Sequence, residues 1–228
     1  MYRYSVIIPH YDGIVTDDQF NNCINYLLDQ TEQNFEVLIY HDGPTSRPIP
    51  NTWEKLGDRC KLKITKDRYN DWGHSLRDMG IREANGDYIF HFNPDNVIYK
   101  TLFSKVSEVI DCSSFPMIGS EKNPTFANGD IVIFPIYMMG HVRFGLKNYS
   151  GFRLNPGQNI LPNYKMIFNG DPCVFANIDC MQLIMKRKLW LGYNGWYDKR
   201  SFSDGIMYER FVHEHGARYC GEVLGEHW

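Results

Sequence analysis

Short apolar runs alternate with helical patterns along roughly the first 110 residues of the chain. The apolar runs span residues 5–8, 35–40 and 88–92, with a weaker one at 62–64. The helical patterns lie between and after them, at about 17–28, 75–84 and 102–110. Continuous apolar runs of this length are typical of strands buried on both faces. The alternation therefore predicts an α/β fold with a doubly wound, mostly parallel central sheet flanked by helices.

The second half of the chain is less regular. Residues from about 115 to 170 are rich in Pro, Gly and Asn, with one strand-like run at 130–134. The pattern predicts helices at 178–190 and 204–215 and a final strand at 219–224. No internal repeat or low-complexity linker interrupts the chain. Its 228 residues suffice for one large α/β domain, so we expect a single domain.

Composition argues against several classes of protein. The formal net charge is −3, so no excess of Lys and Arg points to a nucleic-acid or anionic-membrane partner. No apolar run reaches membrane-spanning length, and the first residues lack the layout of a signal peptide. The six cysteines are scattered without a C-x-x-C pair, which is typical of reduced thiols. We therefore expect a cytoplasmic protein with no transmembrane segment and no nucleic-acid partner.

Polar side chains follow three of the predicted strands at the points where the strands end. The three exits read PHYD at residues 9–12, HDG at 41–43 and NPDN at 93–96. In open α/β sheets, ligands bind just beyond the carboxyl ends of the parallel strands. We therefore expect these three exits to meet and form one binding pocket.

Several segments occur in an order and spacing that resemble a known family. They are SVIIP at 5–9, QT at 30–31, NFEV at 34–37, HDG at 41–43, GHSLRDMGI at 73–81 and ANGDYI at 84–89. Together they resemble the opening of family-2 glycosyltransferases, and the chain also resembles the short single-domain transferases of large algal viruses. The resemblance covers roughly the first hundred residues well, the last fifty loosely and little of the middle.

This resemblance implies a GT-A fold, a nucleotide-sugar donor, a divalent cation and an inverting mechanism. It divides the single domain, residues 1–228, into a nucleotide-sugar half at about 1–110 and an acceptor half at about 111–228. The donor would be a nucleotide-diphosphate sugar, with UDP favoured, and the acceptor a hydroxyl group of a glycan or another molecule.

Four residues of the first half take binding roles by this resemblance. Pro9 and Tyr11 would frame the nucleotide base, and Asp42 would hydrogen-bond the base or the ribose. Arg77 would lie near the nucleotide or its diphosphate. Three of them also have a plainer interpretation: Pro9 ends a strand, Asp42 forms a turn before a glycine, and Arg77 is an exposed helix cation.

The cation site is expected at the third strand exit. A divalent cation neutralises the departing diphosphate and needs oxygen ligands, to which Mn²⁺ adds imidazole nitrogen. Asp95 is the best oxygen ligand there, and His227, close to the end of the sequence, is a second metal ligand by resemblance. Asn93 stands where the family carries its first acid, so it would bind a ribose hydroxyl or a metal-bound water. The plainer interpretations are a polar turn for 93–96 and a solvated tail for His227.

The general base is expected in the last third of the chain. Residues 195–198 and 203–205 resemble the family segment that places an acid at a helix start, which makes Asp204 the catalytic base. The preceding family acid is Ser203 here. Asp204 could also merely cap the helix. Asp179 is a lesser candidate for acceptor binding or another cap, and Trp196 and Tyr197 would stack on the acceptor or fill the core.

The resemblance thus implies a metal-dependent inverting glycosyltransferase, located in the cytoplasm, or in that of the host if the chain is viral. Its cofactor would be Mn²⁺ or Mg²⁺. Two other classes stay open. The amide at Asn93 and the incomplete acidic pair suggest a non-catalytic nucleotide-sugar-binding module. A sugar-phosphate nucleotidylyltransferase would need a Gly-rich phosphate loop after the first strand, and residues 9–13 do not supply one.

Overall fold

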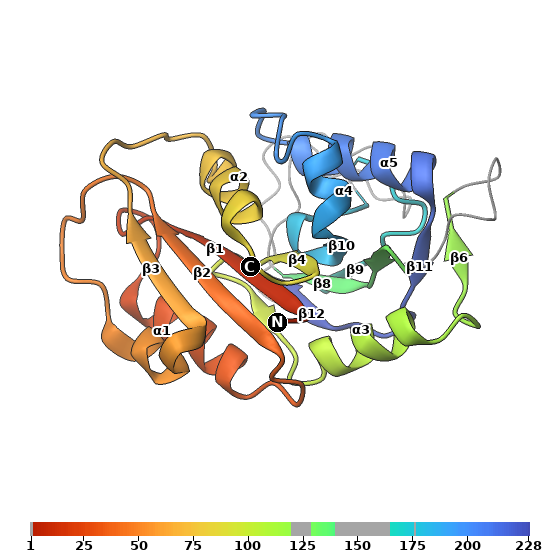
Figure 1. Ribbon diagram of the computed structural model, residues 1–228, viewed down its shortest axis with the longest axis horizontal. Coiled ribbons are helices and arrows are strands. Elements are labelled where there is room, and N and C mark those ends of the chain that lie inside the picture. The colour runs from red at the N-terminus through yellow and green to blue at the C-terminus, as the bar shows by residue number, and fades with distance from the viewer. Residues whose placement is uncertain (1, 120–128, 140–164, 176) are drawn as a thin grey trace.

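The computed structural model describes residues 2–119, 129–139, 165–175 and 177–228. Within these residues an eight-stranded sheet forms the centre of the molecule, and helices cover both of its faces (Figure 1). A smaller sheet of four strands lies beside it. The predicted α/β class, with a central sheet flanked by helices, is confirmed.

The strands of the larger sheet are β1 (Tyr4–His10), β2 (Phe35–His41), β3 (Cys60–Ile64), β4 (Tyr88–His91), β6 (Met117–Ile118), β7 (Ile131–Ile133), β10 (Leu183–Lys186) and β11 (Ala217–Tyr219). The smaller sheet contains β5 (Val97–Ile98), β8 (Ile136–Met139), β9 (Lys165–Phe168) and β12 (Gly225–His227). The helices are α1 (Asp17–Leu28), α2 (His74–Glu83), α3 (Leu102–Asp111), α4 (Arg187–Gly192) and α5 (Ser203–His215), with the 3₁₀ helices η1 (Asn51–Arg59) and η2 (Cys180–Gln182).

The order of strands in the larger sheet is β3-β2-β1-β4-β10-β7-β11-β6. The first four strands are parallel neighbours, whereas β10 runs antiparallel to both β4 and β7. Strand β11 is parallel to β7, and β6 is antiparallel to β11. Strands β1, β2 and β4 therefore end at the same edge of the sheet, as binding at their carboxyl ends requires.

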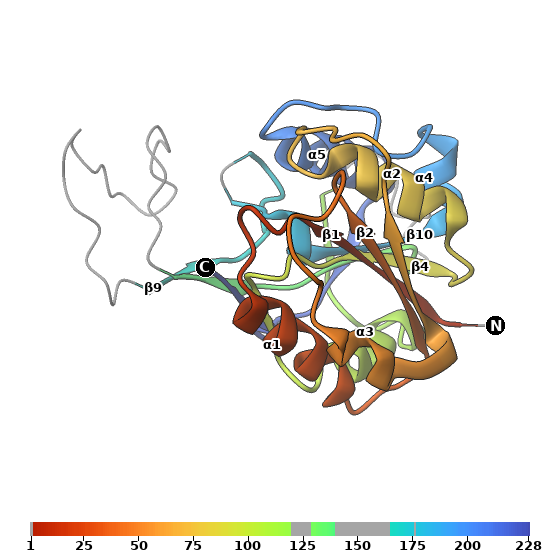
Figure 2. The same cartoon turned by 90° about the vertical axis from the view of Figure 1, so that its left-hand side faces the viewer.

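The two faces of the larger sheet bury two separate apolar cores. Helices α1 and α3 cover one face, and α2, α4 and α5 cover the other (Figure 2). Strand β1 contributes to both cores, because Val6 and Ile8 belong to the first and Ile7 belongs to the second. This two-sided burial explains why the sequence of β1 is continuously apolar rather than alternating.

Helix α1 shows how a local signal in the sequence sets an element boundary. Thr16 is the N-cap of this helix: its hydroxyl accepts a hydrogen bond from the backbone N–H of Gln19. The Gln19 side chain in turn accepts from the backbone N–H of Thr16, which completes a capping box. The apolar face of the helix is buried, at Phe20, Cys23, Ile24 and Leu27.

The helix predicted at 178–190 is wrong. The segment instead contains η2, strand β10 and the beginning of α4. The four residues of β10 pair with β4 on one side and β7 on the other, and Leu183, Ile184 and Met185 are fully buried. A short apolar run fits a buried helix or a buried strand equally well, so pairing with distant strands decided the outcome.

The final strand predicted at 219–224 is also misplaced. Strand β11 ends at Tyr219, and β12 begins only at Gly225. Between them the chain crosses from the larger sheet to the smaller one: Cys220 N–H donates to Ile133 O, and Leu224 N–H donates to Pro135 O. Of the intervening residues, Cys220 and Leu224 are buried against the core, whereas Gly221 and Glu222 are exposed. The apolar residues at the two ends of this segment therefore do not belong to one continuous strand.

The six cysteines all lie in described residues, and none of them forms a disulfide. Among the helices of the described ranges, none is both long enough and apolar enough to cross a membrane.

Replacing Phe103 with alanine is expected to lower the free energy of unfolding by about 3–5 kcal/mol. Phe103 is fully buried under the sheet, and its ring centroid lies 4.9 Å from that of Tyr4 and 5.0 Å from that of Phe35. Urea denaturation measures the loss. The control, Leu191→Ala, truncates a side chain that is 37% exposed and should cost less than about 1 kcal/mol. Equal losses in the two variants would contradict this description of the core.

Candidate active site

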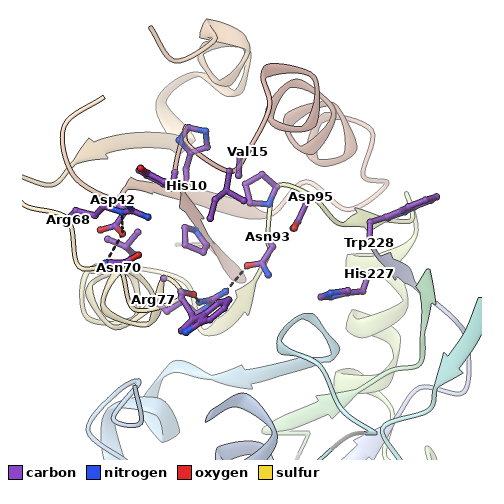
Figure 3. A pocket seen from close by; sticks show the side chains of 17 residues that line it. His10, Val15, Asp42, Arg68, Asn70, Arg77, Asn93, Asp95, His227 and Trp228 are labelled. Atoms are coloured by element: carbon purple, nitrogen blue, oxygen red, sulfur yellow. Dashed lines mark hydrogen bonds and ion pairs between the residues drawn. The ribbon is translucent and has the colours of Figure 1, made fainter. Parts of the chain in front are cut away.

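A cavity of about 650 Å³ lies at the carboxyl ends of β1, β2 and β4 (Figure 3). The three strand exits meet there, as expected from their place in the sheet. Seven of the predicted site residues line this cavity: Pro9, Tyr11, Asp42, Arg77, Asn93, Asp95 and His227. Figure 3 shows Asp42 and Arg68 at one end, Asp95 and His227 at the other, and Arg77 with Asn93 between them.

A cation–aromatic pair forms the wall at the first end of the cavity. The guanidinium of Arg68 lies over the ring of Tyr11, 3.7 Å from its centroid. Gly13 allows this arrangement, because a Cβ there would lie 2.4 Å from Cε1 of Tyr11. Arg68 was not predicted from the sequence, because it follows β3 in a segment without any periodic pattern. The pair presents flat, stacked surfaces at the mouth of the cavity.

Asp42 anchors the loop that carries Arg68. Its Oδ1 accepts a hydrogen bond of 2.7 Å from the backbone N–H of Tyr69, and its Oδ2 accepts one of 3.0 Å from that of Asn70. The carboxylate is buried, and Arg68 Nε lies 3.8 Å from Oδ2. Asp42 is therefore more than a turn residue before Gly43, because it fixes a wall of the cavity.

The same loop continues through three residues with left-handed backbone. Asn70, Trp72 and Gly73 have φ values of 52°, 62° and 78°. For a bulky residue such as Trp72 this conformation costs on the order of 1–3 kcal/mol, and such strain is concentrated at functional sites. A Cβ at Gly73 would lie 2.7 Å from Cβ of Pro9. The strained backbone leaves the Trp72 ring 71% exposed at the cavity.

Arg77 joins this loop to the exit of β4. Its Nη1 donates a 2.7 Å hydrogen bond to Trp72 O, and its Nη2 donates one of 2.6 Å to Asn93 Oδ1. The residue is only 3% exposed, and its guanidinium also lies over the ring of Trp196, 5.1 Å from the centroid. The interpretation of Arg77 as an exposed helix cation is therefore wrong. A buried positive charge faces the middle of the cavity.

Asp95 presents a carboxylate oxygen without a hydrogen-bond donor. Its Oδ1 is buried and accepts no hydrogen bond within the described part of the chain. Burial raises the pKa of Asp95, and nearby Asp179 adds to this, whereas His227 acts in the opposite direction. A buried carboxylate left in this state is typical of a site that receives a positive charge.

Three contacts hold strand β12, which carries His227, at the cavity. Strand β12 pairs with β5 and β8, and Trp228 N–H donates a 3.3 Å hydrogen bond to Asn96 Oδ1. His227 is 8% exposed, and its Nδ1 lies 3.2 Å from Asp179 Oδ2. The interpretation of His227 as a solvated tail residue is wrong.

The donor atoms at this end of the cavity suit a hard or borderline cation. Asp95 supplies carboxylate oxygen and His227 supplies imidazole nitrogen, a combination that Mn²⁺ accepts. Within the described ranges, no three His, Cys, Asp or Glu side chains are arranged as a complete metal site. The two side chains therefore fit part of a cation's coordination shell, and oxygens of a diphosphate are suited to fill the remainder.

Asp204 lies at the second position of α5, in its first turn. The N-cap residue of α5 is Phe202, so Asp204 is not the residue that caps the helix. Asp204 is not among the residues that line the cavity. The charge of Asp204 raises the pKa of Cys180 and of Tyr208, whereas the charge of Arg77 lowers both.

The start of α5 is tied to the start of α2, which borders the cavity. Ser203 Oγ accepts a 3.0 Å hydrogen bond from Trp196 Nε1 and lies 3.3 Å from His74 Nε2. That same His74 nitrogen lies 2.9 Å from Arg200 O. Ser203 is fully buried, so a small hydroxyl occupies the place of the family's first acid. These contacts connect the first turn of α5, which contains Asp204, to the first turn of α2.

Two of the other candidate residues have structural roles. Trp196 is 1% exposed and stacks on Trp190 and on His74, so stacking of Trp196 on an acceptor is excluded in this conformation. Asp179 accepts a hydrogen bond from Met181 N–H and caps η2, as one interpretation of the sequence predicted. Tyr197 is 38% exposed and remains accessible.

Replacing His74 with glutamine is expected to reduce the acid sensitivity of the fold. Burial, followed by the charge of Arg77, lowers the pKa of His74 to about 4 from an ordinary 6.5. As pH falls, the His74 ring is therefore protonated in the unfolded chain before it is protonated in the folded protein. The neutral ring is compatible with the full stability of the fold above pH 6.5, and this stability is progressively lost as pH falls toward 4.

Between about pH 7 and pH 5, this one ring should account for a loss on the order of 2 kcal/mol in unfolding free energy. Urea denaturation at both pH values measures the loss in the wild type, in His74→Gln and in a control, His213→Gln, whose side chain is exposed. Only His74→Gln should lose less stability than the wild type. Parallel losses in all three proteins would contradict the expected effect.

Solved structures share this fold. A TarS fragment from S. aureus in complex with UDP-GlcNAc matches with a TM-score of 0.65 and 14% identity, over 99% of this chain and 58% of that one. The mannosyltransferase PcManGT from Pyrobaculum calidifontis, in complex with GDP-Man and Mn²⁺, matches with a TM-score of 0.59 and 10% identity, over 99% and 56%. The sheet, the helices on its two faces and the cavity at the strand ends define a GT-A glycosyltransferase fold.

Sequence comparisons agree with this class. Residues 5–113, from β1 through α3, match the model of the family described as glycosyl transferase family 2. Glycosyltransferase GlyG from Streptococcus pneumoniae is 25% identical over 176 residues, which are 72% of this chain and 56% of GlyG. The chain thus matches about half the length of this relative. The resemblance to family-2 glycosyltransferases is confirmed.

Proposed function

We propose that the chain is the catalytic domain of an inverting, metal-dependent glycosyltransferase. It transfers a hexosyl-type sugar from a nucleotide-diphosphate donor, with a UDP-sugar favoured, to a hydroxyl group of a glycan or another acceptor. The observation that supports this most is the single cavity at three strand ends, lined by seven residues chosen from sequence. Its volume of about 650 Å³ is within the range of small-molecule sites.

The nucleotide occupies the end of the cavity near β1 and β2 in this proposal. A planar base stacks beside Tyr11 and Pro9, and the guanidinium of Arg68 closes that side. Asp42 acts mainly as a positioning residue, because both of its oxygens already accept backbone N–H groups of the loop. Residues 1–110 then supply the nucleotide-sugar half of the domain.

The diphosphate extends toward Arg77, Asp95 and His227 at the other end. The buried Arg77 guanidinium provides positive charge near the phosphates, and its bond to Asn93 holds the exit of β4 in place. A divalent cation, Mn²⁺ or Mg²⁺, held by Asp95 and His227, would neutralise charge on the departing diphosphate. PcManGT was solved with Mn²⁺ and a nucleotide sugar, and its likeness to this chain supports the same cofactor class here.

Asp204 acts as the general base in the acceptor half, residues 111–228. Its carboxylate takes the proton from the acceptor hydroxyl while that oxygen bonds to the anomeric carbon. The bond from the anomeric carbon to the diphosphate oxygen breaks on the opposite face, so the configuration inverts. The contacts of His74 with Ser203 and Arg200 hold the beginning of α5 beside the donor cavity for this step.

Two observations favour a second function, a nucleotide-sugar-binding module without transfer. The amide of Asn93 is engaged by Arg77, and the described residues contain no complete three-residue metal group. The two functions differ in what happens to a bound donor. A module retains the intact nucleotide sugar, whereas a transferase slowly hydrolyses it when water replaces the acceptor.

The test incubates purified protein with radiolabelled nucleotide sugars, with and without Mn²⁺ and without an acceptor. We expect slow release of free sugar from one donor, faster with Mn²⁺, and none with Asp204→Asn. Thermal-shift screening of UDP-, GDP- and dTDP-sugars first identifies the donor that binds. Tight binding with no hydrolysis by the wild type would favour the module, and an absence of binding would refute both functions.

A further inference from the structure

Two exposed rings, Phe175 and Phe202, form an aromatic pair beside the first turn of α5, the turn that contains Asp204. Phe175 is 47% exposed and Phe202 is 43% exposed, and their ring centroids lie 5.6 Å apart in an edge-to-face arrangement. Phe202 directly precedes α5, and Phe175 packs against Gly205, where a Cβ would lie only 3.0 Å from Cδ2 of Phe175. Exposed apolar groups that touch one another, rather than being scattered singly, are typical of a binding surface.

The position of Phe202 is unfavourable for the helix that follows it. Phe202 is the N-cap residue of α5, and its side chain makes no capping hydrogen bond. Ser, Thr, Asp or Asn at this position would accept a backbone N–H of the first turn and stabilise the helix. The chain instead carries an apolar, partly exposed ring there. A binding role explains this choice of residue, whereas the stability of the helix does not.

Hydrogen bonds close the loop that carries Phe175. The backbone N–H of Asn177 donates to Val174 O at 3.0 Å, and its side-chain amide donates to Pro172 O at 2.9 Å. The N–H of Gly170 donates to Asn177 O at 3.0 Å, and Asn177 is buried. Phe175 is therefore presented to solvent by a loop that is closed on itself.

The aromatic pair is linked to the donor cavity through the first residue of α2, His74. Nε2 of His74 lies 2.9 Å from Arg200 O and 3.3 Å from Ser203 Oγ, and these two residues bracket Phe202 in the sequence. His74 directly follows Gly73, which lines the cavity. Helices α2 and α5 also cover the same face of the larger sheet (Figure 2). A ligand on the aromatic pair would thus lie on the α2 side of the cavity.

The charges around the aromatic pair are balanced. Arg200 lies over the Phe202 ring, with Cζ 5.7 Å from the centroid, and its Nε donates to both carboxylate oxygens of Asp198 at 3.0 Å. This bonding lowers the pKa of Asp198, so the carboxylate stays ionised and offsets the charge of Arg200. Around Phe202 the chain carries two acids, Asp198 and Asp204, and two bases, Lys199 and Arg200. Because the formal charge of this segment is zero, the surface suits an uncharged ligand better than an anionic one.

We propose that the aromatic pair is the acceptor subsite and that it binds a neutral saccharide. The weakly positive C–H groups on one face of a pyranose ring pack on the negative faces of the aromatic rings, and the hydroxyl to be glycosylated points toward Asp204. This inference rests on the proposed function, in which Asp204 is the general base. It narrows the acceptor from any hydroxyl compound to an uncharged sugar chain.

The first test measures the binding of defined sugars to the full chain by saturation-transfer NMR. The probes are four neutral sugars, cellotetraose, maltotetraose, mannotetraose and chitotetraose, and one anionic sugar, tetragalacturonate. We expect at least one neutral sugar to bind through its ring C–H protons, and tetragalacturonate to bind more weakly. Binding of none of the neutral sugars, or of tetragalacturonate alone, would overturn the inference.

Substitutions at Phe202 separate stacking from folding. Phe202→Ser removes the ring but supplies a capping hydroxyl, so Tm should stay within about 3 °C of the wild type. Affinity for the bound sugar should fall at least about fivefold, because an aromatic anchor is lost. Phe202→Tyr keeps an aromatic ring and should retain affinity within about twofold. The control, Met117→Ala, shortens another exposed apolar side chain, on β6, and should leave the affinity unchanged.

Equal affinity in the wild type and in Phe202→Ser would show that the sugar binds elsewhere, which contradicts the inference. If Phe202→Ser lowers Tm by more than about 5 °C, Phe202→Leu replaces it, since leucine keeps apolar bulk without a ring face. The same loss of sugar affinity is expected in that variant.

Other occupants of the aromatic pair predict other results. A membrane surface predicts that the wild type, but not Phe202→Ser, co-sediments with phosphatidylcholine vesicles. A second copy of the chain predicts a concentration-dependent dimer in sedimentation velocity that Phe202→Ser abolishes. Either result, found in place of sugar binding, would overturn the inference.

Donor hydrolysis by the wild type separates this inference from the proposed function, because it needs no acceptor. If the donor is hydrolysed but no neutral sugar binds, or if Phe202→Ser binds the sugar as well as the wild type, only the acceptor subsite fails. If a sugar binds on the aromatic pair but no nucleotide sugar is bound or hydrolysed, the proposed function fails and a saccharide site remains. If neither occurs, both proposals fail.

Discussion

Asp204→Asn is expected to lower kcat by about 100- to 10,000-fold, with little change in donor affinity. The substitution keeps the size of the side chain but removes the group that takes the proton from the acceptor hydroxyl. Donor binding should persist because Asp204 is absent from the residues that line the donor cavity. Initial rates with saturating donor give kcat, and calorimetry with the UDP-sugar and Mn²⁺ gives the affinity.

The control for this prediction is Glu209→Gln, an exposed acid on the same helix. It should retain a rate within about twofold of the wild type and a similar Tm. If Asp204→Asn retains wild-type kcat, another group takes the proton and the assignment of the base is wrong. A large loss in both variants would instead indicate damage to α5 as a whole.

Asp95→Ala is expected to lower the Mn²⁺-dependent component of donor affinity by at least about 100-fold. Loss of an outer-shell partner already costs 10- to 100-fold in metal affinity, and Asp95 is proposed as a direct ligand. Calorimetric titration with UDP, with and without Mn²⁺, measures the difference. Manganese should strengthen UDP binding in the wild type and have almost no effect in the variant.

The Tm of Asp95→Asn, which also removes the charged carboxylate, separates loss of the ligand from unfolding of the chain. Burial raises the pKa of Asp95, so ionisation of this carboxylate is less favourable in the folded protein than in the unfolded chain. At neutral pH the charge therefore destabilises the fold, and Asp95→Asn should not lower Tm. Asp87→Ala removes an exposed acid just before the opposite end of β4 and serves as the binding control. Unchanged manganese dependence in Asp95→Ala would refute the metal assignment.

The cavity could be predicted from the sequence because simple rules position its parts. Parallel strands buried on both faces produce continuous apolar runs, and their carboxyl ends must lie at one edge of the sheet. The residues that immediately follow β1, β2 and β4 are therefore brought together regardless of the details between them. Tyr11, Asp42 and Asp95 reach the same cavity for this reason.

Other parts of the site depend on contacts between distant segments, which no local pattern encodes. Arg68 reaches Tyr11 only because Asp42 binds the loop after β3. The pairing of Asp179 with His227 requires η2 and β12 to meet, and these lie 48 positions apart in sequence. For Arg77 the sequence left a binding role and an exposed helix cation both open, because helical periodicity does not show that a neighbouring loop covers the side chain.

The misassigned segment at 178–190 has the same origin. Leu183, Ile184 and Met185 are apolar on every side because β10 is inserted between two other strands and covered by helices on both faces. A buried helix would show the same residues, so periodicity alone could not separate the two. The antiparallel strand next to β4 is therefore visible only in the assembled sheet.

A crystal structure of the protein with UDP and Mn²⁺ tests the central claim most directly. We predict that the base lies beside Tyr11 and Arg68, the diphosphate near Arg77, and the anomalous manganese signal within bonding distance of an Asp95 carboxylate oxygen. Manganese bound away from Asp95, or UDP outside the cavity at the ends of β1, β2 and β4, would contradict the account.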